Sequence, residues 1–361
     1  MTTTPLQQLI GERIERGGPL TFADYMRVAL YEPGYGYYMS GAARMGWEGD
    51  YFTSSDVSAL FAHCLGRQLS QWWEKLNHPD PFIVLEQGAG RGNLAGDVRT
   101  WAIQNAPNLA AALDYRTADI RLGQDAIDEA APAQAHVVLS NELVDAFPVH
   151  LVEARGATLF EVYVTTQDGR LCERVNEPST PALAAYLERF RVPWTSFGDG
   201  WRAEINLDAL RWLQRAAQLI RHGYILTIDY GDKAKALYTP RRPRGTLRGY
   251  WHHQLSYNPL AHPGTQDITA HVNFSALIDE GRQLGLRLHT FTTQHDWLKG
   301  LGIDIEVEQR RVSEFAAIDT ERATDRGQVA LLKWYDLRNR LATLTDPAGM
   351  GNFKVLALRR P

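Results

Sequence analysis

One stretch of this chain contains residue types that could hold a ligand, namely a carboxylate followed by glycines at alternate positions. It reads Phe82-Ile-Val-Leu-Glu86-Gln-Gly88-Ala-Gly90-Arg-Gly92, with four apolar residues before the carboxylate. This pattern predicts a buried parallel strand that ends in a tight loop before a helix. Glycine permits positive φ and lets a ligand approach the backbone without meeting a Cβ. The stretch therefore predicts a cofactor loop, with Glu86, Gly88, Gly90 and Gly92 as cofactor-binding residues.

The glycine spacing separates two kinds of cofactor. A dinucleotide fingerprint reads G-x-G-x-x-G, and counting from Gly88 places Asn93 where the third glycine belongs. The observed form, E-x-G-x-G-x-G, resembles the first motif of class I S-adenosylmethionine (SAM) methyltransferases, which have a Rossmann-like fold. A carboxylate suits SAM because this cofactor carries an α-ammonium and a sulfonium rather than a pyrophosphate. On this stretch alone, an NAD(P) or FAD protein and a βα turn with packing glycines stay open.

An acid at the end of the next predicted strand extends the same site. The run Tyr115-Arg-Thr-Ala-Asp119 predicts that strand. In Rossmann-like sites an acid at this strand end accepts hydrogen bonds from ribose hydroxyls, so Asp119 is a further cofactor-binding candidate. It lies 27 positions beyond Gly92, and the helix between them is therefore expected to be long.

A later strand over 136–140 runs into Asn141-Glu142-Leu-Val-Asp145. Ligands gather at the carboxyl ends of parallel strands, so this segment is expected to face a second substrate. Glu142 and Asp145 are three positions apart, and one helical turn would let both carboxylates face the same pocket. We expect Asn141, Glu142 and Asp145 to be catalytic, with solvated carboxylates at a helix start as the alternative.

The N-terminal part supplies helices and an aromatic loop. Two helices are predicted over 6–30, and the turn-rich segment 31–38 then carries four tyrosines. Tyr35 is a candidate for the substrate side, with packing of a lid as the alternative. Thr53 and Ser54 precede a helix predicted from about Asp56 to Leu76. They are expected either to contact the cofactor or to cap that helix.

Three later segments carry further candidates for the substrate side. A strand from Tyr224 ends in Asp229 and Tyr230, which are expected to reach the pocket. The loop 241–253 carries four arginines among aromatics, Arg248 among them, and the mildly acidic chain favours a substrate-side loop over a nucleic-acid site. The segment 263–274 is expected to open a helix through about Leu284. Its acid and histidine are candidates for catalysis or recognition, with a structural role as the alternative: Asp267 and His271.

Composition excludes several classes of protein. The chain has 361 residues, 44% of them hydrophobic, and a formal charge of -4, which gives no reason to expect nucleic-acid binding. Cys64 and Cys172 show no C-x-x-C spacing, so we expect neither a disulfide framework nor a metal site. The first residues lack a basic and an apolar region, and no run of ~18 apolar residues occurs. We therefore expect a cytoplasmic protein with neither a secretion signal nor a membrane span.

Taken together, these segments resemble the MidA-like family of class I SAM-dependent methyltransferases, whose mitochondrial members are complex I assembly factors acting as protein arginine methyltransferases. The matching stretches lie in the expected order at 31–38, 49–54, 86–92, 141–148, 229–231, 245–250 and 267–272. Two positions depart from the pattern. Ser55 stands where the family commonly has proline, and Ala118-Asp119 replaces a glutamate-proline pair.

The resemblance implies an α/β fold, namely a Rossmann-like class I methyltransferase sheet with an N-terminal helical segment and inserted β-hairpin and helical elements. We expect a helical or lid segment over 1–80 and a methyltransferase domain over 81–361, with insertions at about 149–205 and 232–270. Thr53, Ser54 and 86–92 would line the SAM site, and 141–145 would face the acceptor.

The implied reaction is methyl transfer from SAM to an arginine of a protein substrate. A guanidinium is cationic and a poor nucleophile, so carboxylates must orient it and ease loss of its proton. One alternative is a non-catalytic SAM-binding assembly factor. A nucleotide-dependent oxidoreductase is the other and would bind NAD(P). The sequence makes no prediction of oligomeric state.

Overall fold

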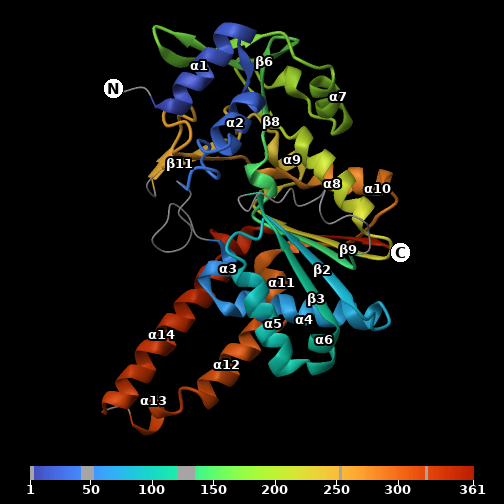
Figure 1. Ribbon diagram of the computed structural model, residues 1–361, viewed down its shortest axis with the longest axis vertical. Helices are drawn as coiled ribbons and strands as arrows, with labels where there is room; N and C mark the ends of the chain where they lie inside the picture. The colour runs from blue at the N-terminus through green and yellow to red at the C-terminus, as the bar shows by residue number, and fades with distance from the viewer. Residues whose placement is uncertain (1–3, 42–52, 121–134, 252–253, 322–323) are drawn as a thin grey trace. The chain divides into compact units, whose positions relative to one another are not determined.

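The computed structural model describes residues 4–41, 53–120, 135–251, 254–321 and 324–361 (Figure 1). The chain divides into two compact units. Unit 1 consists of 1–51, 142–217 and 231–286, and unit 2 of 52–141, 218–230 and 287–361. The expected N-terminal segment 1–80 thus contributes to both units. Residues 49–52 of one family motif and the histidines of the arginine loop, His252 and His253, lie outside the described residues.

Unit 2 is built on a sheet of six strands, counted over the described residues, in the order β15-β16-β9-β4-β2-β3. Strands β9, β4, β2 and β3 run parallel, whereas β16 is antiparallel to both of its neighbours. The strand bounds are β2 Phe82–Gln87, β3 Leu113–Ala118, β4 Val137–Asn141, β9 Gly223–Asp229, β15 Arg287–Thr293 and β16 Lys354–Arg360. Every residue of β4 and β9 is buried, as expected for strands covered on both faces. The α/β prediction is confirmed.

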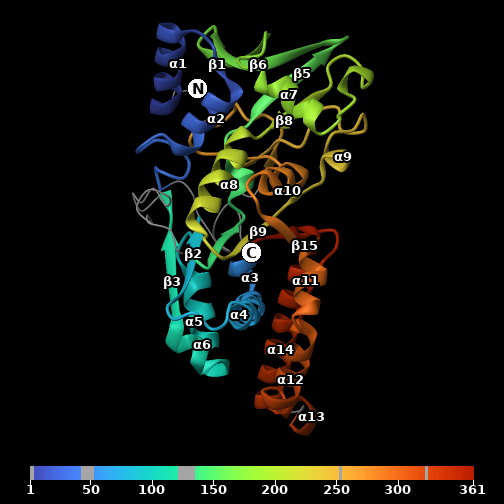
Figure 2. The ribbon, with the colours of Figure 1, turned by 90° about the vertical axis from the view of Figure 1, so that its right-hand side faces the viewer.

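Helices cover this sheet in unit 2 (Figure 2). Their bounds are α3 Ser54–Val57, α4 Ala59–Lys75, α5 Asn93–Asn105, α6 Pro107–Ala112 and α11 Gln294–Gly300. The helix predicted over 56–76 is interrupted at Ser58, whose extended backbone ends α3 and whose hydroxyl accepts a hydrogen bond from Leu60 N at 3.2 Å. The single long helix expected before β3 is two helices, α5 and α6, which are separated by the non-helical Ala106, and Pro107 begins α6.

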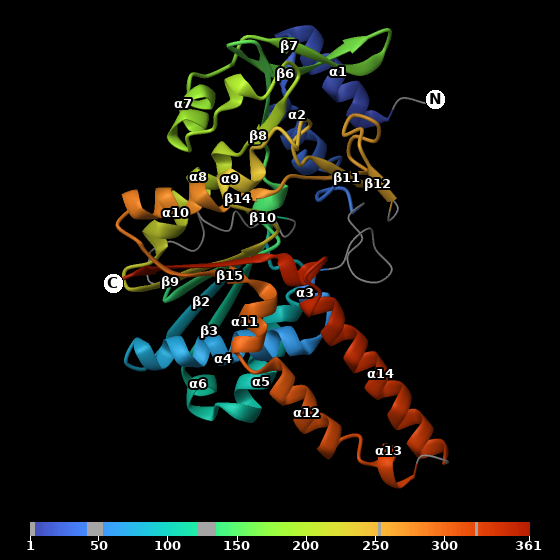
Figure 3. The ribbon, with the colours of Figure 1, turned by 180° about the vertical axis from the view of Figure 1, so that it is seen from behind.

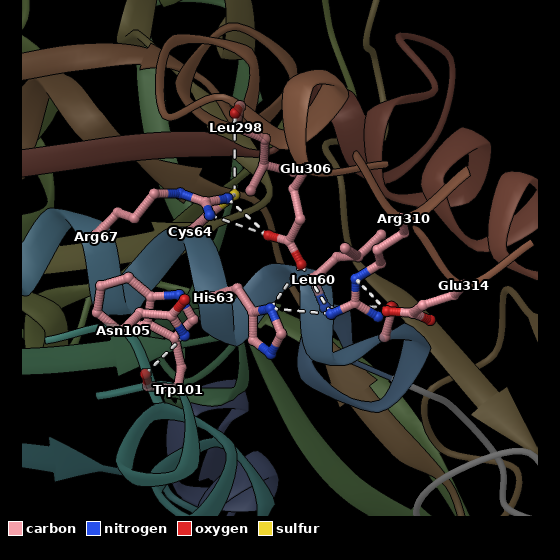
Figure 4. A network of polar contacts seen from close by, with 11 residues as sticks. Leu60, His63, Cys64, Arg67, Trp101, Asn105, Leu298, Glu306, Arg310 and Glu314 are labelled. Atoms are coloured by element: carbon pink, nitrogen blue, oxygen red, sulfur yellow. Dashed lines mark hydrogen bonds and ion pairs between the residues drawn. The ribbon is translucent and has the colours of Figure 1, made fainter. Parts of the chain in front are cut away.

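The end of unit 2 is a helical arm, which we define as α12 Ile303–Ser313, α13 Ala317–Thr320 and α14 Asp325–Thr345 (Figure 3). Glu306 fastens α12 to α4 (Figure 4). Its carboxylate lies 2.7 Å from His63 Nδ1, 3.0 Å from both terminal nitrogens of Arg67 and 2.8 Å from Arg310. Burial alone would raise the pKa of Glu306, but the contacts with His63 and Arg67 outweigh burial and lower it.

Unit 1 contains an antiparallel sheet of five strands, as far as its described residues show, in the order β1-β6-β5-β8 with β7 paired to β6. Its strands are β1 Leu20–Thr21, β5 His150–Arg155, β6 Thr158–Gln167, β7 Arg170–Asn176 and β8 Arg202–Ile205. The predicted β-hairpin insertion is confirmed by β6 and β7. Its turn residues, Asp168 and Gly169, both have positive φ, which matches the twist of the paired strands. The predicted N-terminal helices are α1 Pro5–Gly17 and α2 Phe22–Tyr31.

The rest of unit 1 holds short strands and helices. They are η2 Val144–Ala146, α7 Ala182–Arg189, η3 Trp194–Ser196, β10 Gly231–Asp232, α9 Ala234–Leu237, β11 Arg248–Trp251, β12 Gln254–Ser256, β13 Asp267–Thr269, β14 Val272–Asn273 and α10 Phe274–Gln283. Helix α8 Leu207–Leu219 begins in unit 1 and ends in unit 2. The expected helix start over 263–274 is wrong, because this segment forms β13 and β14 and the helix begins only at Phe274. Pairing of β13 with β11 fixes the extended backbone.

Candidate functional site

The carboxyl ends of the parallel strands in unit 2 carry most of the predicted cofactor residues. Glu86 lies near the end of β2, where it pairs in register with Thr117 of β3 and Leu139 of β4. Asp119 directly follows β3, and Asn141 ends β4. Asp229 ends β9 and is fully buried, and its Oδ1 accepts a hydrogen bond from Tyr230 N at 2.9 Å. One edge of one sheet therefore gathers these acids and the asparagine, as the strand pattern predicts.

The glycine loop adopts a left-handed backbone at its alternate positions. Gly88, Gly90 and Gly92 have φ of 71°, 59° and 75°. A Cβ added to Gly92 would meet no atom within 4 Å, so the backbone conformation rather than crowding favours glycine there. Gly92 is also the N-terminal cap residue of α5, which places the loop at the start of a helix as expected.

The amides of this loop are bound by the protein itself. Gly88 N donates to Ala118 O at 2.9 Å, Gly92 N to Ala89 O at 2.9 Å, and Gly90 N to Asp119 Oδ2 at 2.8 Å. In a phosphate-binding loop such amides point at the anion. This loop consequently suits a ligand that brings no phosphate to it, which favours SAM over a dinucleotide. The Asp119 carboxylate holds the loop in shape, and its contact with a ribose stays a prediction.

Glu86 places a buried carboxyl group next to the loop. Its side chain is 3% exposed, and Tyr115 Oη donates to Oε2 at 3.1 Å. Burial raises the pKa of Glu86 to about 8, the hydrogen bond from Tyr115 opposes this rise, and the neighbouring charge of Asp119 adds to it. A buried acid in this state is stabilised by an approaching cation. The site therefore fits the α-ammonium or sulfonium of SAM, and the chain offers Glu86 and the three loop glycines to hold the cofactor.

Thr53 and Ser54 both bind neighbouring protein atoms. Thr53 caps α3, since its backbone N and its Oγ1 both donate to Asp56 Oδ2, at 3.1 and 3.0 Å. Ser54 is fully buried, and its Oγ donates to Gln294 Oε1 at 3.1 Å. The capping alternative is therefore realised at Thr53, and cofactor contact by either residue stays a prediction.

The predicted arrangement of Glu142 and Asp145 on one helical turn is wrong. The chain passes from unit 2 to unit 1 between Asn141 and Glu142. Glu142 has φ of +51°, a conformation rarely adopted by glutamate, and the 3-10 helix η2 begins only at Val144. Asp145 lies within η2 and is 5% exposed. The left-handed backbone at Glu142 prevents a continuous helical turn over both acids.

In unit 1 the structure instead associates Asp145 with Asp267. Asp267, on β13, is 4% exposed, and Tyr38 Oη donates to its Oδ1 at 2.8 Å. Ala270, just beyond β13, donates its N–H to Asp145 O at 3.0 Å. Tyr250 of β11 pairs in register with Asp267. Burial raises the pKa of Tyr250, and the charges of Asp267 and Asp145 raise it further. Asp145 and Asp267 are thus two buried acids on segments joined by a backbone hydrogen bond.

The other predicted substrate-side residues surround β11. Arg248 NH1 donates to Leu247 O at 2.7 Å, and its guanidinium carbon lies 5.1 Å from the ring centroid of Tyr257. His271 uses its backbone N to donate to Thr246 Oγ1 at 3.1 Å.

Sequence reasoning missed Tyr38 and selected Tyr35 from the same loop. Tyr35 is 50% exposed, whereas Tyr38 holds Asp267 and stacks on Tyr31 with ring centroids 5.5 Å apart. The cluster of four tyrosines was the available signal. It could not single out Tyr38, because the bonding partner lies 229 residues away.

Comparisons with known proteins agree with this geometry. Residues 64–292 match the family described as "Putative S-adenosyl-L-methionine-dependent methyltransferase". A relative from Drosophila melanogaster, named protein arginine methyltransferase NDUFAF7 homolog, mitochondrial, is 27% identical over 98% of this chain and 84% of its own length. The Rattus norvegicus protein arginine methyltransferase NDUFAF7, mitochondrial, is 27% identical over 96% and 82%.

Two crystal structures from Burkholderia thailandensis resemble the whole fold. One is the structure of a methyl transferase candidate with S-adenosyl-homocysteine bound. It is 28% identical, has a TM-score of 0.79, and the match covers 98% of this chain and 92% of that chain. The other is a native crystal structure. It is 27% identical, has a TM-score of 0.74, and the match covers 98% of this chain and 91% of that chain.

The comparisons correct one expectation. The predicted cytoplasmic location is contradicted by the curated relatives above, whose names assign both to mitochondria. Within the part of the chain that the structure describes, no helix has the length and apolar character needed to cross a membrane. The same residues contain no group of three or more His, Cys, Asp or Glu side chains arranged to hold a metal ion.

Proposed function

Because the chain belongs to the family of S-adenosyl-L-methionine-dependent methyltransferases that its residues 64–292 match, we propose that it methylates an arginine side chain of a protein substrate. SAM supplies an electrophilic methyl group on its sulfonium. Relatives named protein arginine methyltransferase support arginine as the acceptor. Two buried acids in unit 1, Asp267 and Asp145, support arginine as the acceptor independently of these names.

Unit 2 is proposed to bind SAM through the edge of its parallel sheet. Glu86 would face the cationic part of the cofactor, since burial leaves its carboxyl in need of a positive partner. The left-handed glycines allow close approach to the backbone. Asp119 keeps the loop in this shape by accepting from Gly90 N, and we propose that it also reaches the ribose. Thr53, Ser54 and Asn141 are proposed to complete the binding site.

Unit 1 is proposed to bind the guanidinium. The observation that carries this assignment is that two buried acids, Asp267 and Asp145, lie on segments joined by the hydrogen bond from Ala270 N to Asp145 O. An arginine guanidinium has five N–H donors and no acceptor, so it needs carboxylates to fix its plane. Holding it in one orientation also aligns a single nitrogen for attack, and alignment of this kind can contribute several kcal/mol to barrier lowering.

Glu142 is proposed to accept the proton that the guanidinium must lose. A glutamate held at φ of +51° is a strained residue, and strain of this kind is most often retained at functional positions. It follows Asn141 at the end of β4, where ligands of parallel sheets gather. The family resemblance further suggests a subunit of respiratory complex I, or of a homologous complex, as the acceptor protein.

A comparison of cells with and without this gene tests the proposal. Proteins from both are digested, and peptides carrying methylated arginine are quantified by tandem mass spectrometry. We expect at least one methylarginine site to disappear on deletion and to return when the wild-type gene is restored. Restoration by Glu86→Ala to the same level would contradict the proposal, because that variant removes the charge proposed to hold SAM. A methylarginine pattern unchanged by deletion would also contradict it.

A further inference from the structure

Unit 1 exposes large apolar side chains around its acidic site. Over the described residues of unit 1, those with more than a third of their surface exposed are Tyr35 at 50%, Leu255 at 44% and Tyr257 at 73%. An exposed aromatic cluster beside a polar site is typical of a surface that binds another molecule. The three side chains belong to two segments, and each segment touches the strand or loop that carries Asp267.

Tyr257 lies beside the acidic site through the β11-β12 hairpin. Gly249 pairs with Ser256, so continuing the antiparallel register places Tyr257 opposite Arg248. The Arg248 guanidinium covers the Tyr257 ring at 5.1 Å. On its other side β11 pairs with β13, where Tyr250 lies opposite Asp267. Tyr257 and Asp267 therefore flank the same central strand.

Tyr35 lies beside the same site through the loop after α2. A Cβ added to Gly264 would come within 2.5 Å of Tyr35 O, so the loop that leads into β13 packs against the backbone of Tyr35. Three residues further on, Tyr38 donates to Asp267. The loop after α2 therefore contacts both β13 and the segment that leads into it. Tyr25 Oη also joins them by donating to Pro259 O at 2.7 Å.

We propose that Tyr35, Leu255 and Tyr257 form a docking surface for the polypeptide on either side of the acceptor arginine. This inference rests on the proposed function. Charge complementarity identifies the bound group. The carboxylates of Asp267 and Asp145 bind a cation, whereas the surrounding aromatic rings bind uncharged atoms of a polypeptide. Free arginine would satisfy the carboxylates and leave the rings uncovered. The preferred substrate is therefore an arginine within a protein segment.

Binding can be measured without turnover. The full chain, saturated with S-adenosyl-homocysteine, is titrated into a fluorescein-labelled pool of nonapeptides that have a central arginine and random flanking residues. Tyr35→Ser/Tyr257→Ser is expected to weaken binding about tenfold or more, as for the loss of aromatic anchors at an interface. The control is Val329→Ser/Leu332→Ser on the helical arm, where the two apolar side chains are 50% and 69% exposed in unit 2. The control is expected to bind as the wild type does.

Three outcomes would overturn the docking surface: no binding by the wild type, equal affinity of the tyrosine variant and the wild type, or an equal loss in the arm variant. The single variant Tyr257→Ser repeats the measurement if the double variant melts at a lower temperature. A second pool with central lysine separates this inference from the proposed function. If both pools bind equally and both depend on the tyrosines, the docking surface stands and arginine as the acceptor fails.

Discussion

Tyr38 Oη donates a hydrogen bond of 2.8 Å to Asp267 Oδ1, although 229 residues separate them in the chain. The tyrosine ring is itself held by stacking on Tyr31, whose hydroxyl donates to Ala146 O at 2.9 Å. The contact therefore links the tyrosine loop, β13 and the segment that carries Asp145. It fixes the orientation of the carboxylate proposed to bind the acceptor.

Removing this hydroxyl tests the acceptor side. Tyr38→Phe is expected to lower kcat/KM for the protein acceptor by about tenfold to a hundredfold, because a hydrogen bond to a charged group contributes roughly 1.5–3 kcal/mol. The dissociation constant of SAM, measured by calorimetry, should stay unchanged. Tyr163→Phe is the matched control, since that hydroxyl donates to a backbone oxygen, Glu177 O, at 2.9 Å in the same unit. Equal losses in the two variants would remove Tyr38 from the acceptor site.

Glu142 combines a proposed role with an unfavourable backbone. Glu142→Gln is expected to abolish transfer and to leave SAM affinity nearly unchanged, and full activity in this variant would exclude Glu142 as the proton acceptor. Glu142→Gly should raise the free energy of unfolding by up to about 1 kcal/mol, since glycine tolerates positive φ. Asp168→Gly, at the same φ of +51° in the β6-β7 turn, should stabilise similarly and retain activity. Urea unfolding with activity assays distinguishes these cases.

The raised pKa of Glu86 predicts pH-dependent cofactor binding. Below about pH 8 the free protein holds a proton on Glu86, and a cationic ligand must displace it. SAM affinity should therefore increase as pH rises from 6 to 8, by up to about tenfold per unit, and level off above 8. Glu86→Gln should remove the part of the pH dependence of SAM affinity that comes from Glu86. Titration of SAM itself affects both proteins equally, so it cancels when the affinity of the variant is compared with that of the wild type. A slope that survives the substitution would contradict the role of Glu86.

The raised pKa of Glu86 also affects the stability of the ligand-free protein, which should decrease as pH rises, whereas SAM affinity should increase. The pKa of Glu86 is higher in the folded chain than its ordinary value of 4.5, so the folded state retains a proton that the unfolded state loses. The Glu86 contribution to the free energy of unfolding should therefore fall as pH rises from about 4.5 to about 8. Comparing melting temperatures of wild type and Glu86→Gln across this range measures it.

Glu306 is expected to stabilise the attachment of the helical arm. Glu306→Gln leaves His63, Arg67 and Arg310 without their shared carboxylate and should cost about 2 kcal/mol. The control Glu314→Gln removes an exposed carboxylate 3.9 Å from Arg310 and should change stability by less than about 0.5 kcal/mol. The folded pKa of Glu306 is lowered, so its contribution is present above its ordinary value of 4.5 and is lost as pH falls. Urea unfolding at pH 7 and pH 4 checks both statements.

Local patterns in the sequence were sufficient for the cofactor edge. Apolar runs predicted β2, β4 and β9, and the alternating glycines predicted a loop whose left-handed residues the structure contains. Such runs favour parallel pairing, and these three strands do pair in parallel. Asp119 was located correctly at its strand end, although the structure gives it a bond to Gly90 N that the spacing could not indicate.

The acceptor side was harder to predict because non-local pairing forms it. Residues 267–269 are extended because they pair with β11. The residues that follow favour a helix, and the sequence prediction started that helix too early, before Phe274. Glu142 has a positive φ that its side-chain type does not favour, so a helical turn was the reasonable expectation. Tyr38 gains its role from a partner in another part of the chain. Such features depend on the fold as a whole.

Transfer of a labelled methyl group tests the central claim most directly. The purified chain is incubated with trideuteromethyl-SAM and proteins extracted from cells that lack the gene, and labelled residues are located by tandem mass spectrometry. The account predicts label on arginine side chains with the wild type, and a large decrease with Asp267→Asn at unchanged SAM affinity. Label found only on lysine or another residue would contradict arginine as the acceptor. SAM binding without any transfer would contradict catalysis and favour a binding role in assembly.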